Sequence, residues 1–164
     1  MRILRSQQTS RPGSHILDPE IRRAALGLLA TREHSRGELA RKLAVRGFAE
    51  DAVETALDAL AETGELDESR LAEAYVAERL RKGIGPLRIR LELRGKGLSD
   101  DLIDPHLQRA SADWLQLIAA AHDKRFGQTA ATDIRERARR CRFLEQRGFP
   151  ADLITRFLRG GPEA

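Results

Sequence analysis

The chain has 164 residues, of which 41% are hydrophobic but only 4% aromatic, and its 29 basic and 25 acidic residues leave a net charge of +4. This length predicts one domain or a short string of small modules, and the scarcity of large rings favours thin helical layers over one bulky core. The lone Cys141 excludes an internal disulfide framework and favours a reducing compartment, so that a cytoplasmic protein is expected.

Residues 1–16 are predicted to be a disordered basic tail, because they are rich in Ser, Gln and Arg and contain no acid. No apolar run long enough for a signal peptide follows this positive charge. No later segment approaches the roughly 18 apolar residues of a transmembrane helix. The sequence therefore indicates neither export nor insertion in a membrane.

From residue 17 onward the chain matches itself at a spacing of about fifty residues. The shared pattern is Leu, three residues, Gly, an apolar residue, two residues, Asp, one residue, an apolar residue, three residues and Leu. It occurs at Leu43, Gly47, Phe48, Asp51, Val53 and Leu57; at Leu93, Gly97, Leu98, Asp101, Ile103 and Leu107; and at Leu144, Gly148, Phe149, Asp152, Ile154 and Leu158. Three matches in register predict three repeats, at residues 17–64, 65–108 and 109–160.

Each repeat is predicted to contain a helical hairpin. The pattern glycine follows a basic residue and suits the left-handed position just past a helix end, where a basic side chain also favours the helix dipole. The next helix begins within a few residues, with Asp51 or Ser99 near its first turn. Its apolar residues are spaced for one buried stripe.

A further helix is predicted upstream of each hairpin, over residues 19–32, 67–82 and 111–126. Asp18 and Pro19 supply an N-cap and a proline at the first helical position, while Ser35 and Glu38 form a capping box. The segment 83–86 ends one helix and opens the next with proline. Nine helices in three triplets predict an all-α fold of three tandem three-helix repeats, stacked into an elongated, curved module array.

Basic residues gather near the middle helix of the second and third repeats, and acidic residues gather on the third helices. The acidic residues are Glu50, Asp51, Glu54 and Asp58 in the first repeat and Asp100, Asp101 and Asp104 in the second. The candidate contact residues are Arg79, Arg81, Lys82, Arg88, Arg90, Arg94 and Lys96, with Arg135, Arg139, Arg140 and Arg142. Two basic helices on successive repeats could meet phosphates or an acidic protein groove, whereas the simpler interpretation is a solvated face of weak surface pairs.

The sequence offers little for catalysis or for reading bases. It has no phosphate-binding loop, no zinc-type clustering of Cys and His and no nucleophile elbow, so neither a metal nor another cofactor is expected. The four histidines are dispersed. Tyr75, Trp114 and the phenylalanines mostly lie at the spacing of a helix core. Any DNA contact is therefore expected to be made with the backbone.

Three stretches together resemble the RecX family. They are ALGLLATREHSRGELARKLAVRGF, GELDESRLAEAYVAERLRKGIGPLRIRLELRGKGL and CRFLEQRGFPADLITRFL, and the resemblance covers about residues 20–158. The most specific part is the second repeat, although Leu71 stands where family members usually have Phe, and Glu68 where a second Asp is common. The matching residues there are Asp67, Arg70, Ala72, Tyr75, Arg79, Gly83, Gly85, Arg88, Leu93, Lys96 and Gly97.

The resemblance implies three tandem three-helix repeats and a regulator rather than an enzyme. RecX proteins bind the RecA filament on single-stranded DNA and inhibit its ATP hydrolysis, strand exchange and co-protease activity. They thereby restrain homologous recombination, DNA repair and the SOS response. The implied partners are the RecA filament and single-stranded DNA, with double-stranded DNA left open. The family has no catalytic residues to transfer, so the basic residues above are contact candidates only.

Two other interpretations remain open at this stage. Residues 35–66 have the spacing of helices and turn that is typical of a helix-turn-helix, which would fit a winged-helix transcription regulator. That model needs a β-hairpin after Gly64, where the sequence has helical spacing, and it leaves the repeats at Gly97 and Gly148 unexplained. A small helical nuclease would need converging carboxylates and a metal ion.

Overall fold

The computed structural model describes residues 18–110 and 114–160, and within these residues it contains nine helices and no strand. The first triplet is α1 (Pro19–Leu29), α2 (Arg36–Val45) and α3 (Glu50–Glu62). The second is α4 (Glu68–Arg81), α5 (Pro86–Gly95) and α6 (Asp100–Arg109). The third is α7 (Trp114–Phe126), α8 (Ile134–Gln146) and α9 (Ala151–Arg159).

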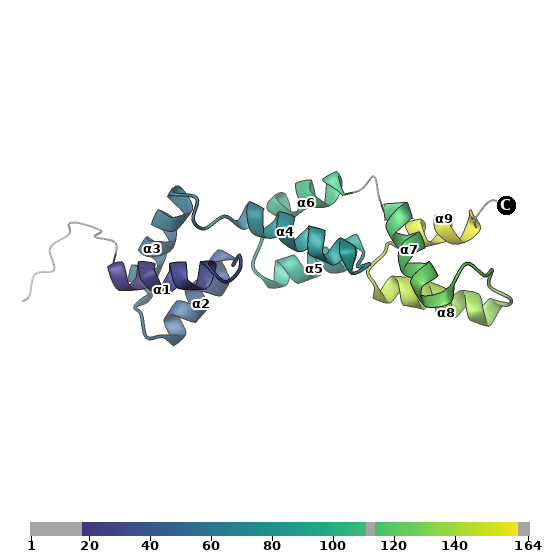
Figure 1. The fold of residues 1–164 in the computed structure, drawn as a ribbon, viewed down its shortest axis with the longest axis horizontal. Coiled ribbons are helices and arrows are strands. Elements are labelled where there is room, and N and C mark those ends of the chain that lie inside the picture. The colour runs from purple at the N-terminus through teal and green to yellow at the C-terminus, as the bar shows by residue number, and fades with distance from the viewer. Residues whose placement is uncertain (1–17, 111–113, 161–164) are drawn as a thin grey trace, which may run out of the picture.

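The three triplets follow one another along the long axis of the molecule, with α1–α3 at one end and α7–α9 at the other (Figure 1). The predicted all-α array of tandem three-helix repeats is therefore confirmed. The predicted tail, 1–16, lies outside the described residues, as do the first three residues of the helix predicted over 111–126. We refer to α1–α3, α4–α6 and α7–α9 as repeats 1, 2 and 3.

Local signals in the sequence set most helix ends. The carboxylate of Asp18 accepts a hydrogen bond from the amide of Glu20 at 2.8 Å. The capping box is confirmed, since Ser35 and Glu38 each accept a bond from the other's amide at 3.1 Å. Helix α1 stops before the predicted residue 32, because the amide and hydroxyl of Thr31 both bind the carbonyl of Leu28, at 3.1 and 2.7 Å.

The pattern glycines end the second helix of each repeat, as predicted. Gly47, Gly97 and Gly148 have φ angles of +89°, +94° and +86°. A residue with a Cβ adopts this left-handed conformation only with strain, so glycine is favoured at the turn. The turn then directs the third helix back across the second.

The buried apolar side chains form two cores rather than three. Repeat 1 has its own core, in which Leu39, Leu43 and Leu57 are fully buried. Repeats 2 and 3 share a single core that runs from Leu71 in α4 to Ile154 in α9. The boundary between repeats 2 and 3 is therefore apolar, whereas no buried apolar cluster in the described residues crosses from repeat 1 to repeat 2.

The joint between repeats 2 and 3 brings two backbones into close contact. The amide of Gly85 donates to the carbonyl of Arg147 at 2.8 Å, and the amide of Leu87 donates to that of Gly148 at 3.0 Å. A Cβ at Gly85 would lie 2.5 Å from the carbonyl carbon and oxygen of Gly148, and a Cβ at Gly148 would lie 2.4 Å from that of Arg88. Both positions therefore require glycine for steric reasons.

The joint between repeats 1 and 2 is formed at equivalent positions, where the start of the second helix of one repeat meets the end of the second helix of the next. The interactions there are different. Ser35, fifty residues before Gly85, donates its hydroxyl to the carbonyl of Lys96 at 2.5 Å. The ammonium of Lys96 binds Glu38 at 2.8 Å, and Glu68 accepts a bond from the amide of Arg36 at 2.8 Å. A hydroxyl and ionic groups thus hold the first joint, whereas backbone bonds and an apolar core hold the second.

Candidate functional site

Most of the candidate residues in repeat 2 are paired with acids of the same repeat. Arg94 binds Asp100 through two nitrogens, at 2.7 and 2.5 Å, and Arg90 pairs with Asp104. The hydrogen bond from Arg94 lowers the pKa of Asp100. In the same way, Lys82 pairs with Glu78 at 2.5 Å and Arg88 with Glu92 at 3.1 Å. The acids of the third helix therefore neutralise part of the basic face on α5.

Arg79 is held inside repeat 2 by an aromatic and an acidic partner. Its Nη2 donates to the hydroxyl of Tyr75 at 2.7 Å, and that hydroxyl donates to Glu92 at 2.9 Å. Its Nε lies 2.7 Å from the Glu92 carboxylate, although without the alignment of a hydrogen bond, and its guanidinium lies 4.7 Å from the centre of the Tyr75 ring. Arg79 thus connects α4 to α5.

Lys96 is committed to the joint between repeats 1 and 2 through Glu38. Burial by itself raises the pKa of Glu38, but the hydrogen bonds from Lys96 and from the Ser35 amide outweigh burial and lower the pKa from 4.5 to about 2. The Glu38 side chain is only 13% exposed. The carboxylate is therefore the charged centre of the first joint.

This lowered pKa predicts an acid-sensitive first joint. Above pH 4.5 the ionised Glu38 contributes its full stabilisation, on the order of 2 kcal/mol, and this is lost as the pH falls from 4.5 through about 2. We expect Glu38→Gln to cost about this much at pH 7, measured by urea unfolding, and much less near pH 2. An equal cost of the substitution at both pH values would contradict the assignment.

Arg140, a candidate in repeat 3, lies inside the molecule with only 5% of its side chain exposed. Its Nη1 donates to the carbonyl of Thr129 at 2.6 Å, and its Nη2 donates to Glu136 at 3.0 Å. His122 lies 3.2 Å from Nη1. Arg140 therefore holds the segment between α7 and α8 against α8, and little of it is available to a partner.

Three candidates face solvent without an ion pair to any described residue. They are Arg81 at the end of α4 and Arg135 and Arg142 on α8. Arg139 is also exposed, although its Nη2 lies 3.3 Å from Glu136. The positions 135, 139, 142 and 146 recur at four, three and four residues, which places their side chains on one face of α8. The exposed basic surface is therefore clearest in repeat 3.

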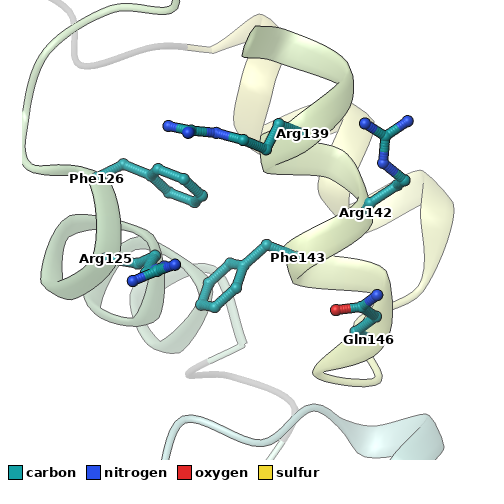
Figure 2. Close-up of a pocket in the computed structure, with 6 residues that line it drawn as sticks. All are labelled: Arg125, Phe126, Arg139, Arg142, Phe143 and Gln146. Carbon is teal, nitrogen blue, oxygen red and sulfur yellow. The ribbon is translucent and has the colours of Figure 1, made fainter. Parts of the chain in front are cut away.

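This face of α8 borders a cleft of about 430 Å³ between α7 and α8. It is lined by Arg125, Phe126, Arg139, Arg142, Phe143 and Gln146. Figure 2 shows the rings of Phe126 and Phe143 in the space between the two helices, with the Arg139 guanidinium beside Phe126. The two ring centres are 5.3 Å apart in an edge-to-face arrangement, and the guanidinium carbon of Arg139 lies 5.3 Å from the centre of Phe126. No carboxylate lines the cleft.

Sequence reasoning missed several residues of this cleft. Phe126 and Phe143 have helix-core spacing but are only partly buried, and Arg125 lies in the last turn of a mainly apolar helix. A usable signal was the pair of basic residues at the end of α7, Lys124 and Arg125. Gln146 lies on the same face of α8 as the arginines, but a pattern of basic residues does not identify it because its side chain is neutral.

Other polar groups form no metal-type cluster in the part of the chain that the structure describes. No group of three or more His, Cys, Asp or Glu residues there is arranged to hold a metal ion. His106 and His122 are buried, and Cys141 packs against the shared core. None of the described helices combines the length and the apolar character of a membrane span. The basic surface is therefore the strongest candidate for function.

Comparison with known proteins gives matches through all three repeats. Models of the first, second and third three-helix domains of RecX match residues 22–60, 67–107 and 112–158. Regulatory protein RecX of Halorhodospira halophila (strain DSM 244 / SL1) is 49% identical over 134 residues, which are 82% of this chain and 83% of that protein. Regulatory protein RecX of Ectopseudomonas mendocina (strain ymp) is 46% identical over 143 residues, or 87% and 95%. The crystal structure of RecX from Lactobacillus salivarius, at 22% identity, superimposes with a TM-score of 0.77 over 85% of this chain and 93% of that one.

Proposed function

Because the chain belongs to the RecX family, we propose that it binds the RecA filament on single-stranded DNA and inhibits ATP hydrolysis, strand exchange and co-protease activity. The observation that carries this proposal is the match of all three RecX domains, in order, to the three repeats. A regulator of this kind acts by binding and needs no catalytic site of its own. Its place of action would be the cytoplasm, with the filament, and its effect would be to restrain homologous recombination and the SOS response.

The shape and the charge of the molecule support binding to a long partner. The repeats extend along one axis, so that contacts can be spread over several subunits of a filament (Figure 1). The exposed arginines of α8 would meet acidic protein surface or exposed phosphate, for which the forked guanidinium is well suited. Occupying the groove of the filament in this way would hinder the rearrangements on which ATP hydrolysis and strand exchange depend.

The proposal predicts strong inhibition of the ATPase activity that the cognate RecA shows on single-stranded DNA. When the protein is titrated from far below stoichiometric amounts, we expect the rate of ATP hydrolysis to fall at least tenfold. The reason is that each elongated molecule spans neighbouring subunits. Inhibition at low ratios would support capping or disassembly of the filament, and inhibition only near one molecule per site would support binding along the groove.

Two controls separate this function from simple competition for DNA. The inhibition should persist when single-stranded DNA is added in excess over both proteins, because the partner is the filament. Double substitution of Arg135 and Arg142 by glutamine removes two exposed charges and should weaken inhibition without changing unfolding. Undiminished ATP hydrolysis with folded protein in large excess would refute the proposal.

A further inference from the structure

The cleft between α7 and α8 is lined by arginines and phenylalanines and by no carboxylate, unlike the basic surface of repeat 2. Three of its six lining residues are arginines, two are phenylalanines and one is a glutamine. By contrast, Arg90 and Arg94 of repeat 2 are each bound to an aspartate. Of the arginines that line the cleft, Arg139 pairs with Glu136 at 3.3 Å, a carboxylate that lies outside the lining and also binds Arg140. The cleft therefore keeps a net positive charge.

Phe126 holds the guanidinium group of Arg139 at the edge of the cleft. The centre of its ring lies 5.3 Å from the guanidinium carbon of Arg139. Such cation–π contacts hold a planar cation against a ring and lower the conformational entropy that binding would otherwise remove. The Arg139 side chain remains exposed, so the guanidinium can offer a flat surface to a second planar group.

We propose that this cleft binds one unpaired nucleotide of a single-stranded nucleic acid. One of the two phosphates that flank this nucleotide would lie at Arg125 and the other at Arg142, because Figure 2 shows these two guanidinium groups on different sides of the cleft. The base would stack on Arg139. Guanidinium planes and aromatic rings are the surfaces on which unpaired bases stack. Gln146, with both a donor and an acceptor, suits the edge of a base.

The size and chemistry of the cleft favour this ligand over two others. A volume of about 430 Å³ admits a small-molecule-sized group such as a nucleotide but not a duplex. An acidic peptide would pair with the arginines, but its carboxylates would not stack on the rings of Phe126 and Phe143 or on the guanidinium plane of Arg139. This inference rests on the nucleic-acid contact in the proposed function and adds the contact of a base to that of the backbone.

The test measures binding of a fluorescently labelled single-stranded oligodeoxythymidine to the full chain, without RecA, by anisotropy at several salt concentrations. Arg142→Gln removes a phosphate contact, so it should weaken binding about fivefold and reduce the slope of log K against log salt by ~0.7. Arg41→Gln, which removes an exposed charge of α2 that is not among the candidate contacts, is the matched control and should leave the slope unchanged. Equal slopes for the two variants would overturn the phosphate assignment.

A second variant tests stacking separately from charge. Arg139→Lys keeps the charge but loses the planar group, so it should weaken binding of the oligonucleotide about fivefold or more. It should leave unchanged the binding of an abasic strand with the same phosphates. Equal losses on both strands, or displacement of the oligonucleotide by a polyglutamate of the same charge, would show that no base is held.

The RecA ATPase assay distinguishes failure of this inference from failure of the proposed function. If the wild-type chain inhibits RecA but Arg142→Gln and Arg139→Lys bind the oligonucleotide like the wild type, the cleft assignment is wrong and the regulatory function stands. If both variants lose binding while the wild-type chain leaves RecA unaffected, the cleft assignment stands and the regulatory function is wrong.

Discussion

Replacing Gly85 with alanine is expected to separate repeat 3 from repeat 2 without unfolding either hairpin. The φ of Gly85 is −83°, so alanine is compatible with the local backbone. The added Cβ, however, would lie 2.5 Å from the carbonyl of Gly148 and 2.6 Å from the amide nitrogen of Phe149. Relieving this overlap would break the two backbone hydrogen bonds of the joint and open the shared core, at a cost of about 3 kcal/mol. Urea unfolding measures the cost, and small-angle scattering detects the change in shape.

Gly95→Ala is the matched control for this substitution. Gly95 lies at the end of α5, and a Cβ there would meet no atom within 4 Å. Alanine in a helix is more favourable than glycine, so this variant should be more stable than the wild type by up to about 1 kcal/mol. If Gly85→Ala had the stability and scattering profile of the wild type, the close contact at the joint would be disproved.

Replacing Arg140 with methionine is expected to destabilise repeat 3 by about 1–2 kcal/mol. Methionine retains the apolar stem but removes the donor to the carbonyl of Thr129 and one of the two arginine partners of Glu136, which keeps Arg139. Each lost hydrogen bond costs about 1 kcal/mol, because Thr129 and Glu136 remain accessible to water. The free energy of unfolding in urea provides the measurement.

Arg142→Met, two residues along the same helix, serves as its control. The exposed Arg142 has no ion pair to any described residue, so its replacement should change the free energy of unfolding by less than about 0.5 kcal/mol. The two variants should therefore change different properties of the protein. Arg140→Met should lose stability, and Arg142→Met should lose affinity for phosphate. Unchanged unfolding of Arg140→Met would show that the buried network does not hold the segment before α8.

The repeats were predictable because local chemistry specifies them. The left-handed turn at Gly97 and the capping box of Ser35 and Glu38 depend on residues within one or two helical turns, so their spacing in the sequence is sufficient. The proline that opens α5 is likewise a local signal. Nine helices in three triplets follow from such signals, and a helix follows Gly64 where a winged helix would require a β-hairpin.

The functional surface was less predictable because charge density does not show which charges are paired. Arg90 and Arg140 both lie in basic stretches, yet one is neutralised by Asp104 on the next helix and the other is buried. These outcomes depend on how helices cross, which spacing within one helix does not determine. The same holds for Gly85 and Gly148, whose roles depend on contacts between residues more than sixty positions apart.

The two joints differ in their response to ions in solution. At 0.1 M salt, ions screen exposed charges over about 10 Å, so the partly exposed pair of Arg70 with Glu33, which also connects repeat 2 to repeat 1, weakens as salt rises. The largely buried pair of Lys96 with Glu38 weakens much less. Backbone bonds and a shared apolar core do not weaken in this way. Salt is therefore expected to loosen part of the connection between repeats 1 and 2 and to leave the connection between repeats 2 and 3 unchanged.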